Sequence, residues 1–161
     1  MDLLTQEEYK SIAANLSLPT SAFIDGGYRP AASGKTFETL NHATGERLAD
    51  VAACAQDDVD FAVSKAREAF DDGRWSKMHP SDRKDVLIRF AKLMTRNARE
   101  LAVMEAIDSG KTIFDCETVD IPETIHCIKW HAEANDKIYD QVSPASVDHI
   151  AMVVHEPIGV V

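Results

Sequence analysis

The sequence lacks the features that mark nucleic-acid-binding, secreted or membrane-spanning proteins. Its 161 residues carry 17 Lys and Arg against 27 Asp and Glu, a formal net charge of −10, without a basic cluster. Because affinity for phosphates comes largely from Lys and Arg, nucleic acids and anionic membranes are not expected partners. No run approaches the roughly 18 apolar residues of a membrane span, and the amino terminus has no signal-peptide pattern. We therefore expect a soluble, cytoplasmic protein.

Cysteine is scarce, and none of the three cysteines has the surroundings of a catalytic nucleophile. Cys54, Cys116 and Cys127 are odd in number and widely spaced, so they do not form a disulfide framework. Acidic neighbours of Cys54 and Cys116 disfavour the reactive thiolate. Cys127 adjoins His126, but adjacent residues of a helix point in different directions. These cysteines are interpreted as structural or surface residues in a reducing compartment.

Motifs for phosphate or metal binding are also missing or weak. The seven glycines form neither a dinucleotide-binding Gly-x-Gly-x-x-Gly motif nor a Walker-type loop. Glu123, Cys127 and His131 stand four residues apart, a spacing that would place three ligands on one helix face. The alternative is a half-buried helix face with an acid near its start, a core thiol and a hydrogen-bonded histidine. The second interpretation is favoured, because no further Cys/His pair supports a metal.

The first fifty residues predict a short helix followed by small antiparallel strands. Apolar residues at helical spacing before Pro19 indicate a helix in the lead segment, residues 1–20. FIDGGY at 23–28 predicts a hairpin around an Asp-Gly-Gly turn. A second strand pair is predicted over 36–41 and 48–52, joined by the turn at 43–46.

From Gln56 the apolar period changes to that of helices, and four of them are expected between 56 and 140. The first has its apolar face from Val59 to Phe70 and stops at Gly73. The second starts at Pro80, and the third ends at Gly110 in a left-handed conformation. The fourth starts near Ile121 and has a buried face that reaches Ile138. Exposed apolar stripes on the second and fourth helices predict self-association.

The last fifteen residues are an apolar, β-branched run that ends abruptly. Chain ends usually become polar and frayed, and an exposed apolar strand pairs readily with another strand. We therefore expect either a chain truncated after residue 161 or an arm that pairs with a partner.

Along the chain stand FIDGGY (23–28), TF (36–37), NHATGE (41–46), AREAF (66–70) with Trp75, ELA (100–102), EAIDSGK (105–111) and HEPIGVV (155–161). In their order and spacing, these segments together resemble the amino-terminal part of the aldehyde dehydrogenase superfamily. Residues 120–122, 128–134 and 136–139 resemble the branch that acts on aminoaldehydes, including γ-glutamyl-aminobutyraldehyde. His42 departs from the proline that the family usually has after the asparagine.

The resemblance implies a fold class and a division of the chain. The class is α/β (α+β for this fragment alone): small antiparallel strands, about four helices and a terminal oligomerisation strand. Residues 1–20 would be a helical lead. Residues 21–140 would be the N-terminal part of the cofactor-binding domain, with strands in 21–52 and helices in 56–140. Residues 141–161 would start the oligomerisation arm.

The resemblance also implies an activity whose reacting groups this chain does not contain. Members of the family are NAD(P)-dependent oxidoreductases that convert an aldehyde to a carboxylic acid through a cysteine thiohemiacetal, with a glutamate that activates water. Those residues and the glycine-bearing cofactor segment lie beyond residue 161 in the family. No catalytic or cofactor-binding residue is therefore assigned here, and the fragment alone is expected to be inactive, because the chemistry needs these groups together.

Two features of the family do fall on residues of this chain. Some members bind a monovalent cation through backbone carbonyls that correspond to Thr39 and Leu40 and through a carboxylate that corresponds to Asp108. Oxygen ligands suit a hard cation. The alternative is that Asp108 only hydrogen-bonds the end of its helix. Residues 147–161 correspond to the arm through which family members form homo-oligomers.

Two functions from different classes remain open at this point. The first is the N-terminal fragment of an NAD- or NADP-dependent aldehyde dehydrogenase. The second is a non-catalytic helical interaction module that binds a partner through its apolar C-terminal strand.

Overall fold

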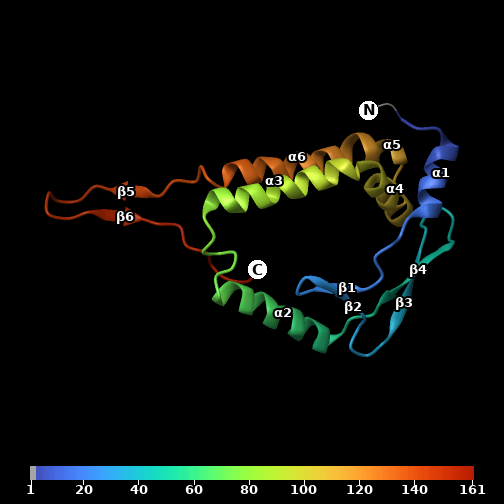
Figure 1. Ribbon diagram of the computed structural model, residues 1–161, viewed down its shortest axis with the longest axis horizontal. Coiled ribbons are helices and arrows are strands. Elements are labelled where there is room, and N and C mark those ends of the chain that lie inside the picture. Colours follow the sequence, from blue (N-terminus) through green and yellow to red (C-terminus); the bar gives the residue numbers. More distant parts are fainter. Residues whose placement is uncertain (1–2) are drawn as a thin grey trace.

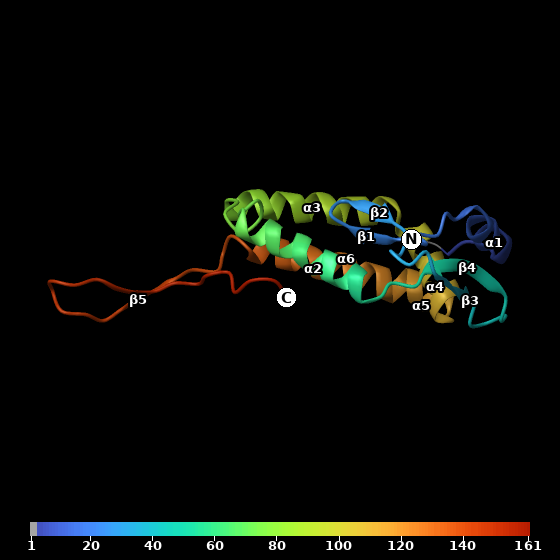
Figure 2. The same ribbon diagram turned by 90° about the horizontal axis from the view of Figure 1, so that it is seen from below.

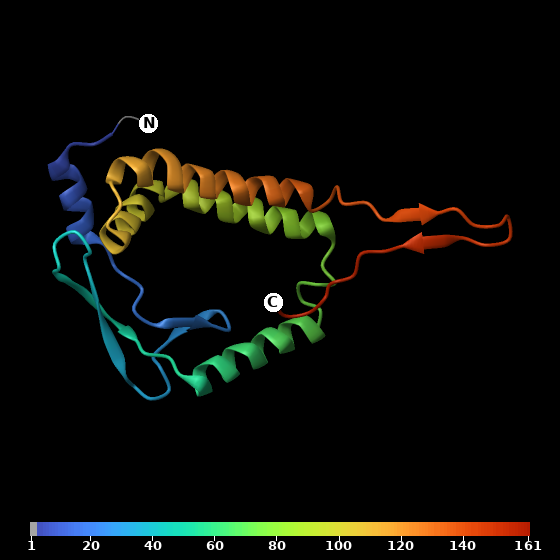
Figure 3. The same ribbon diagram turned by 180° about the vertical axis from the view of Figure 1, so that it is seen from behind.

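The chain folds into an open frame of helices and short strands rather than around one central core. The computed structural model describes residues 3–161; Met1 and Asp2, the first residues of the predicted lead segment, lie outside the described residues. The helical pair α3/α6 runs along one side of the frame and α2 along the other, and the N-terminal hairpins connect them (Figure 1). Seen from behind, the same frame has a long hairpin projecting from one end (Figure 3).

The lead segment contains helix α1, Gln6–Asn15, which confirms the helix predicted before Pro19. Its start is fixed by a capping box. The Thr5 hydroxyl accepts the Glu8 N–H at 3.4 Å, and the Glu8 carboxylate accepts the Thr5 N–H at 2.8 Å. The Thr5 N–H and the Thr5 hydroxyl both donate to the Glu8 carboxylate, and these two bonds lower the pKa of Glu8. Because α1 has no buried residue, most of its surface remains open to solvent.

The two predicted hairpins are confirmed. β1 (Ala22–Ile24) and β2 (Gly27–Arg29) pair antiparallel across a two-residue turn in which Asp25 and Gly26 have φ of 56° and 76°. Positive φ at both positions is the requirement of a type I′ turn. β3 (Thr36–Leu40) and β4 (Arg47–Ala52) form the second hairpin, whose register shifts between Thr39 and Leu40.

Helix α2, Gln56–Asp71, is attached to the hairpins through the side chain of Asp58. The Asp58 carboxylate accepts the N–H groups of Ala55 at 2.9 Å and Ala32 at 2.8 Å. These backbone hydrogen bonds lower the pKa of Asp58. The helix ends before Gly73, as predicted.

The remaining helices form the other side of the frame. They are α3 (Pro80–Arg96), α4 (Ala98–Ser109), the short α5 (Ile113–Asp115), a π-helical turn η1 (Cys116–Asp120) and α6 (Ile121–Ala134). α3 and α6 lie side by side along their length (Figures 1 and 2). A small core joins α4, η1 and α6, with Ala102, Cys116 and Ile121 at its centre.

The fourth predicted helix differs from the observed one at both ends. Its expected start near Ile121 is the start of α6, but the π-helical turn continues the helical path before it. The predicted buried position of Ile138 is wrong, because α6 ends at Ala134 and Ile138 is 66% exposed. The Asn135 side chain instead donates to the Pro80 carbonyl at 2.9 Å, which fixes the end of α6 against the start of α3.

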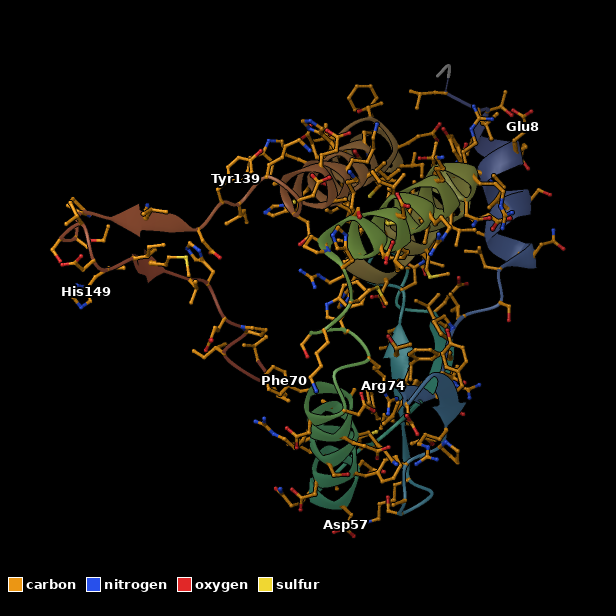
Figure 4. The ribbon with its side chains drawn as sticks, turned by 60° about the vertical axis from the view of Figure 1, so that its left-hand side comes forward. Glu8, Asp57, Phe70, Arg74, Tyr139 and His149 are labelled. Carbon is orange, nitrogen blue, oxygen red and sulfur yellow. The ribbon has the colours of Figure 1, made fainter. Side chains whose placement is uncertain are left out.

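The C-terminal segment is a projecting hairpin. β5 (Gln141–Ser143) and β6 (Ala151–Val153) pair antiparallel, with Tyr139 near the base and His149 near the tip (Figure 4). The base is closed where the Asp140 carboxylate accepts the His155 backbone N–H at 2.9 Å. The strand predicted over 147–161 is shorter than expected, because only three of its residues pair, and they pair within the chain.

Large apolar side chains are exposed on both sides of the frame. On α2, Val59 and Val63 from the predicted apolar face are 52% and 53% exposed. Phe90, from the predicted apolar stripe of α3, is 49% exposed, and Trp130 of α6 is also exposed. Such surfaces usually mark contacts with further protein.

Candidate functional site

Thr39 and Asp108, which the sequence predicted for a cation site, line one cavity. The cavity has a volume of about 390 Å³ and lies between the β3–β4 hairpin and the C-terminal half of α4. Its walls include Phe37 and Leu48 from the hairpin and Ile107 from the helix. The fold therefore brings a carboxylate and a strand backbone to the same space.

Two local features position the β3 backbone at Thr39 and the Asp108 carboxylate. In β4, Leu48 is the extra residue of the register shift, because Thr39 pairs with Ala49 while Leu40 pairs with Arg47. A bulge of this kind interrupts the ladder of backbone hydrogen bonds and bends the strand. The bulge lies beside the predicted carbonyl ligands.

The second feature is the end of α4 at Gly110. Its φ is 77°, the left-handed conformation predicted for this glycine. A Cβ added there would lie 3.0 Å from the Cβ of His42, in the turn between β3 and β4. The glycine therefore lets the end of α4 approach the hairpin closely, and Asp108 is two residues before this contact.

The cavity contains residues that the sequence did not indicate. Leu18 and Pro19, from the end of the lead segment, line it together with Met104. Met104 is four residues before Asp108, so helical spacing from Asp108 is the signal that would have found it. Leu40 does not line the cavity, and its side chain is exposed. The predicted ligand from Leu40 is its backbone carbonyl, and that ligand remains a prediction.

The helical spacing of Glu123, Cys127 and His131 does not create a metal centre. The His131 Nδ1 lies 2.9 Å from the Cys127 carbonyl oxygen, a hydrogen bond within the helix. The Glu123 carboxylate instead lies 3.8 Å from His126 Nδ1. Among residues 3–161, no group of three or more His, Cys, Asp and Glu side chains is arranged to hold a metal ion. In the same range, no helix is both long and apolar enough to cross a bilayer.

The surroundings of Cys116 are those of a structural residue. Its side chain is fully buried beside Ala102 and Ile121. Burial raises the pKa of the Cys116 thiol, and the negative charges of Asp120 and Glu105 raise it further. A thiol in such an environment stays protonated and is a poor nucleophile.

Comparison with known proteins places the chain in a family. The family model described as "Aldehyde dehydrogenase family" matches residues 28–161. This chain belongs to the aldehyde dehydrogenase family. Aminoacetaldehyde dehydrogenase of Pseudomonas aeruginosa is 56% identical over 160 residues, which are 99% of this chain and 32% of that protein. The NADP/NAD-dependent aldehyde dehydrogenase PuuC of Escherichia coli is 42% identical over 149 residues, 92% of this chain and 30% of PuuC.

A solved aldehyde dehydrogenase has the same arrangement of elements. The indole-3-acetaldehyde dehydrogenase AldA of P. syringae, in complex with NAD⁺, matches with a TM-score of 0.95 and 44% identity. The match covers 98% of this chain and 32% of AldA. The chain spans about a third of the length of these aldehyde dehydrogenases and corresponds to the N-terminal portion of their fold.

Proposed function

We propose that this chain is the N-terminal part of an NAD(P)-dependent aldehyde dehydrogenase that oxidises an aminoaldehyde to the corresponding amino acid. In this reaction the aldehyde, water and NAD⁺ or NADP⁺ give a carboxylate, NADH or NADPH and two protons, and the hydride passes to the nicotinamide. The observation that carries the proposal is the similarity to aminoacetaldehyde dehydrogenase along nearly the whole chain. The names of PuuC and of the AldA complex support NAD and NADP as candidate cofactors.

In this proposal the chain supplies the frame of the enzyme and none of its reacting groups. Cys116 is buried with a raised pKa, and the resemblance assigns no catalytic role to Cys54 or Cys127. The open sides of α2, α3 and α6 carry apolar side chains that the rest of an aldehyde dehydrogenase would cover. The isolated chain is therefore expected to form no NADH from an aldehyde.

We also propose a monovalent cation site at Thr39, Leu40 and Asp108. Support comes from the shared cavity of Thr39 and Asp108 and from the adjacent bulge. Carboxylate and carbonyl oxygens are the ligands that hard cations prefer. A bound ion stabilises the folded chain by mass action, so KCl would raise the melting temperature above its value in choline chloride at equal ionic strength.

Paired variants test the cation site. Asp108→Asn would abolish the difference between the two salts, whereas Glu105→Gln, an exposed acid one turn earlier on α4, would preserve it. Equal melting temperatures of the unmodified chain in potassium and choline chloride would contradict the proposal.

We further propose that the full protein is a cytoplasmic homo-oligomer that assembles through residues 147–161. Val147, Ile150 and Met152 are exposed along the hairpin and offer an apolar surface to a second subunit. The cytoplasmic location is supported by the three free, widely spaced cysteines.

The experiment that tests the proposed activity is mass spectrometry of the native protein, combined with an assay. The proposal predicts a native chain about three times as long as this one, which reduces NAD⁺ or NADP⁺ in the presence of aminoacetaldehyde. A native protein of 17.8 kDa that retains a partner on the exposed hairpin would instead support the non-catalytic interaction module.

A further inference from the structure

The lead segment, residues 3–20, passes over the outside of α4, and each of its residues is exposed or only partly buried. α1 packs against α4 at the end of the frame (Figure 1). The contact is loose, because a cavity of about 360 Å³ lies between the side chains of the two helices, lined among others by Tyr9, Ala13 and Val103. Segments with few buried apolar contacts open locally at low free energy.

One side chain joins the lead segment to the core of the frame. The Tyr9 hydroxyl donates to Glu117 Oε2 at 2.6 Å, and Arg99 Nε of α4 donates to the other Glu117 oxygen at 3.3 Å. The same hydroxyl accepts the Leu4 N–H at 3.1 Å. The Glu117 side chain is only 6% exposed, so its carboxylate depends on these donors. Hydrogen bonds to a buried charge are stronger than those between neutral groups.

The other end of the segment reaches the cavity that contains Asp108. Leu18 and Pro19 form part of the cavity wall, together with residues of the β3–β4 hairpin and of α4. Directly after them, the Thr20 carbonyl accepts the Ala52 N–H of β4 at 2.8 Å. This bond anchors the segment at the hairpin, whereas the Tyr9 bond anchors it at η1. Between these two anchors, movement of α1 would displace the wall formed by Leu18 and Pro19.

We propose that residues 3–20 are a strap that closes the Asp108 cavity, and that the Tyr9–Glu117 hydrogen bond is its latch. Release of the latch lifts α1 from α4 and opens the cavity, while β4 retains the end of the strap. The α3/α6 pair does not take part. The strap requires no bound cation and does not rest on the proposed dehydrogenase activity.

Hydrogen exchange on the full 161-residue chain, measured by mass spectrometry, tests the strap. Tyr9→Phe keeps the ring and removes the hydroxyl. From the usual strength of a hydrogen bond to a charged group, we expect exchange in α1 to accelerate about tenfold or more. Exchange in residues 104–109, beside the cavity, would accelerate with it, while exchange in α3 would remain unchanged. Tyr28→Phe is the matched control, because Tyr28 is exposed on β2.

Each other outcome overturns the proposal. Unchanged exchange in Tyr9→Phe would show that the hydroxyl is not a latch. Faster exchange in α1 alone would show that the segment does not cover the cavity. Equal acceleration in α3 would show general destabilisation rather than local opening, and an unprotected α1 in the unmodified chain would show that no closed strap exists.

Discussion

The contact between Gly110 and His42 gives the sharpest prediction about the geometry around Asp108. Gly110→Ala adds one methyl group at a position with two separate constraints. The backbone has φ of 77°, and the new Cβ would meet the His42 Cβ at 3.0 Å. The β3–β4 turn would have to move away from the end of α4.

The expected loss of stability follows from these two constraints. The left-handed conformation costs an L-residue about 1–2 kcal/mol relative to glycine. Crowding of a packed contact costs about 1–3 kcal/mol, and the lower end applies because the His42 turn is exposed and can yield. Together they predict that Gly110→Ala lowers the free energy of unfolding by about 2–3 kcal/mol.

Gly34→Ala is the matched control. Its φ is 67°, yet nothing lies within 4 Å of the added Cβ, so it retains the backbone constraint without the contact. We expect Gly110→Ala to be less stable than Gly34→Ala by about 1 kcal/mol, which is about 2–4 °C in melting temperature for a chain of this size. Urea unfolding followed by circular dichroism measures the difference. Equal losses in the two variants would refute the inferred contact with His42.

Three further predictions concern charge, thiol reactivity and association. Hydrogen bonds from Lys137 and Lys84 lower the pKa of Asp136 from 3.8 to about 2 in the folded chain. The ionised Asp136 carboxylate therefore stabilises the fold above the unfolded pKa of 3.8, and this stabilisation is lost as the pH falls through the folded pKa of about 2. Asp136→Asn should therefore flatten the decline in melting temperature over this range, and an unchanged acid profile would count against the bonds. In the native chain, Ellman's reagent should modify the exposed Cys54 and Cys127 quickly and Cys116 only on unfolding, whereas three equally fast thiols would contradict the buried position. Sedimentation should show association of the isolated chain at micromolar concentrations through its apolar faces, and a monomer throughout would argue against it.

Local chemistry made several elements predictable from the sequence. The Asp25-Gly26 turn is encoded by residues that tolerate positive φ, and Gly110 ends α4 for the same reason. The family resemblance selected Thr39 and Asp108 as candidate cation ligands. Both residues line one cavity, which is a geometric reason for the same selection. The pattern of neighbouring residues alone would not have joined two positions so far apart in the chain.

Features set by tertiary contacts were not predictable in this way. Tyr9 and Glu117 are 108 positions apart, and neither position has a local signal for the hydrogen bond. Neither the π-helical turn at Cys116–Asp120 nor the bulge at Leu48 was predicted from the sequence. Apolar periodicity located the apolar faces of α2 and α3, and the exposed stripe predicted on α3 agrees with the exposure of Phe90 and Leu93. A period identifies a face and not what covers it.

The most direct test of the central claim is NADH formation by a chimera. In the chimera, this chain replaces the corresponding N-terminal third of the Pseudomonas aeruginosa aminoacetaldehyde dehydrogenase, and the parent enzyme is the control. If the chain is the frame of an aminoaldehyde dehydrogenase, the chimera will fold and oxidise aminoacetaldehyde with NAD⁺, while the isolated chain will not. A folded chimera that binds NAD⁺ and forms no NADH from this aldehyde would contradict the account.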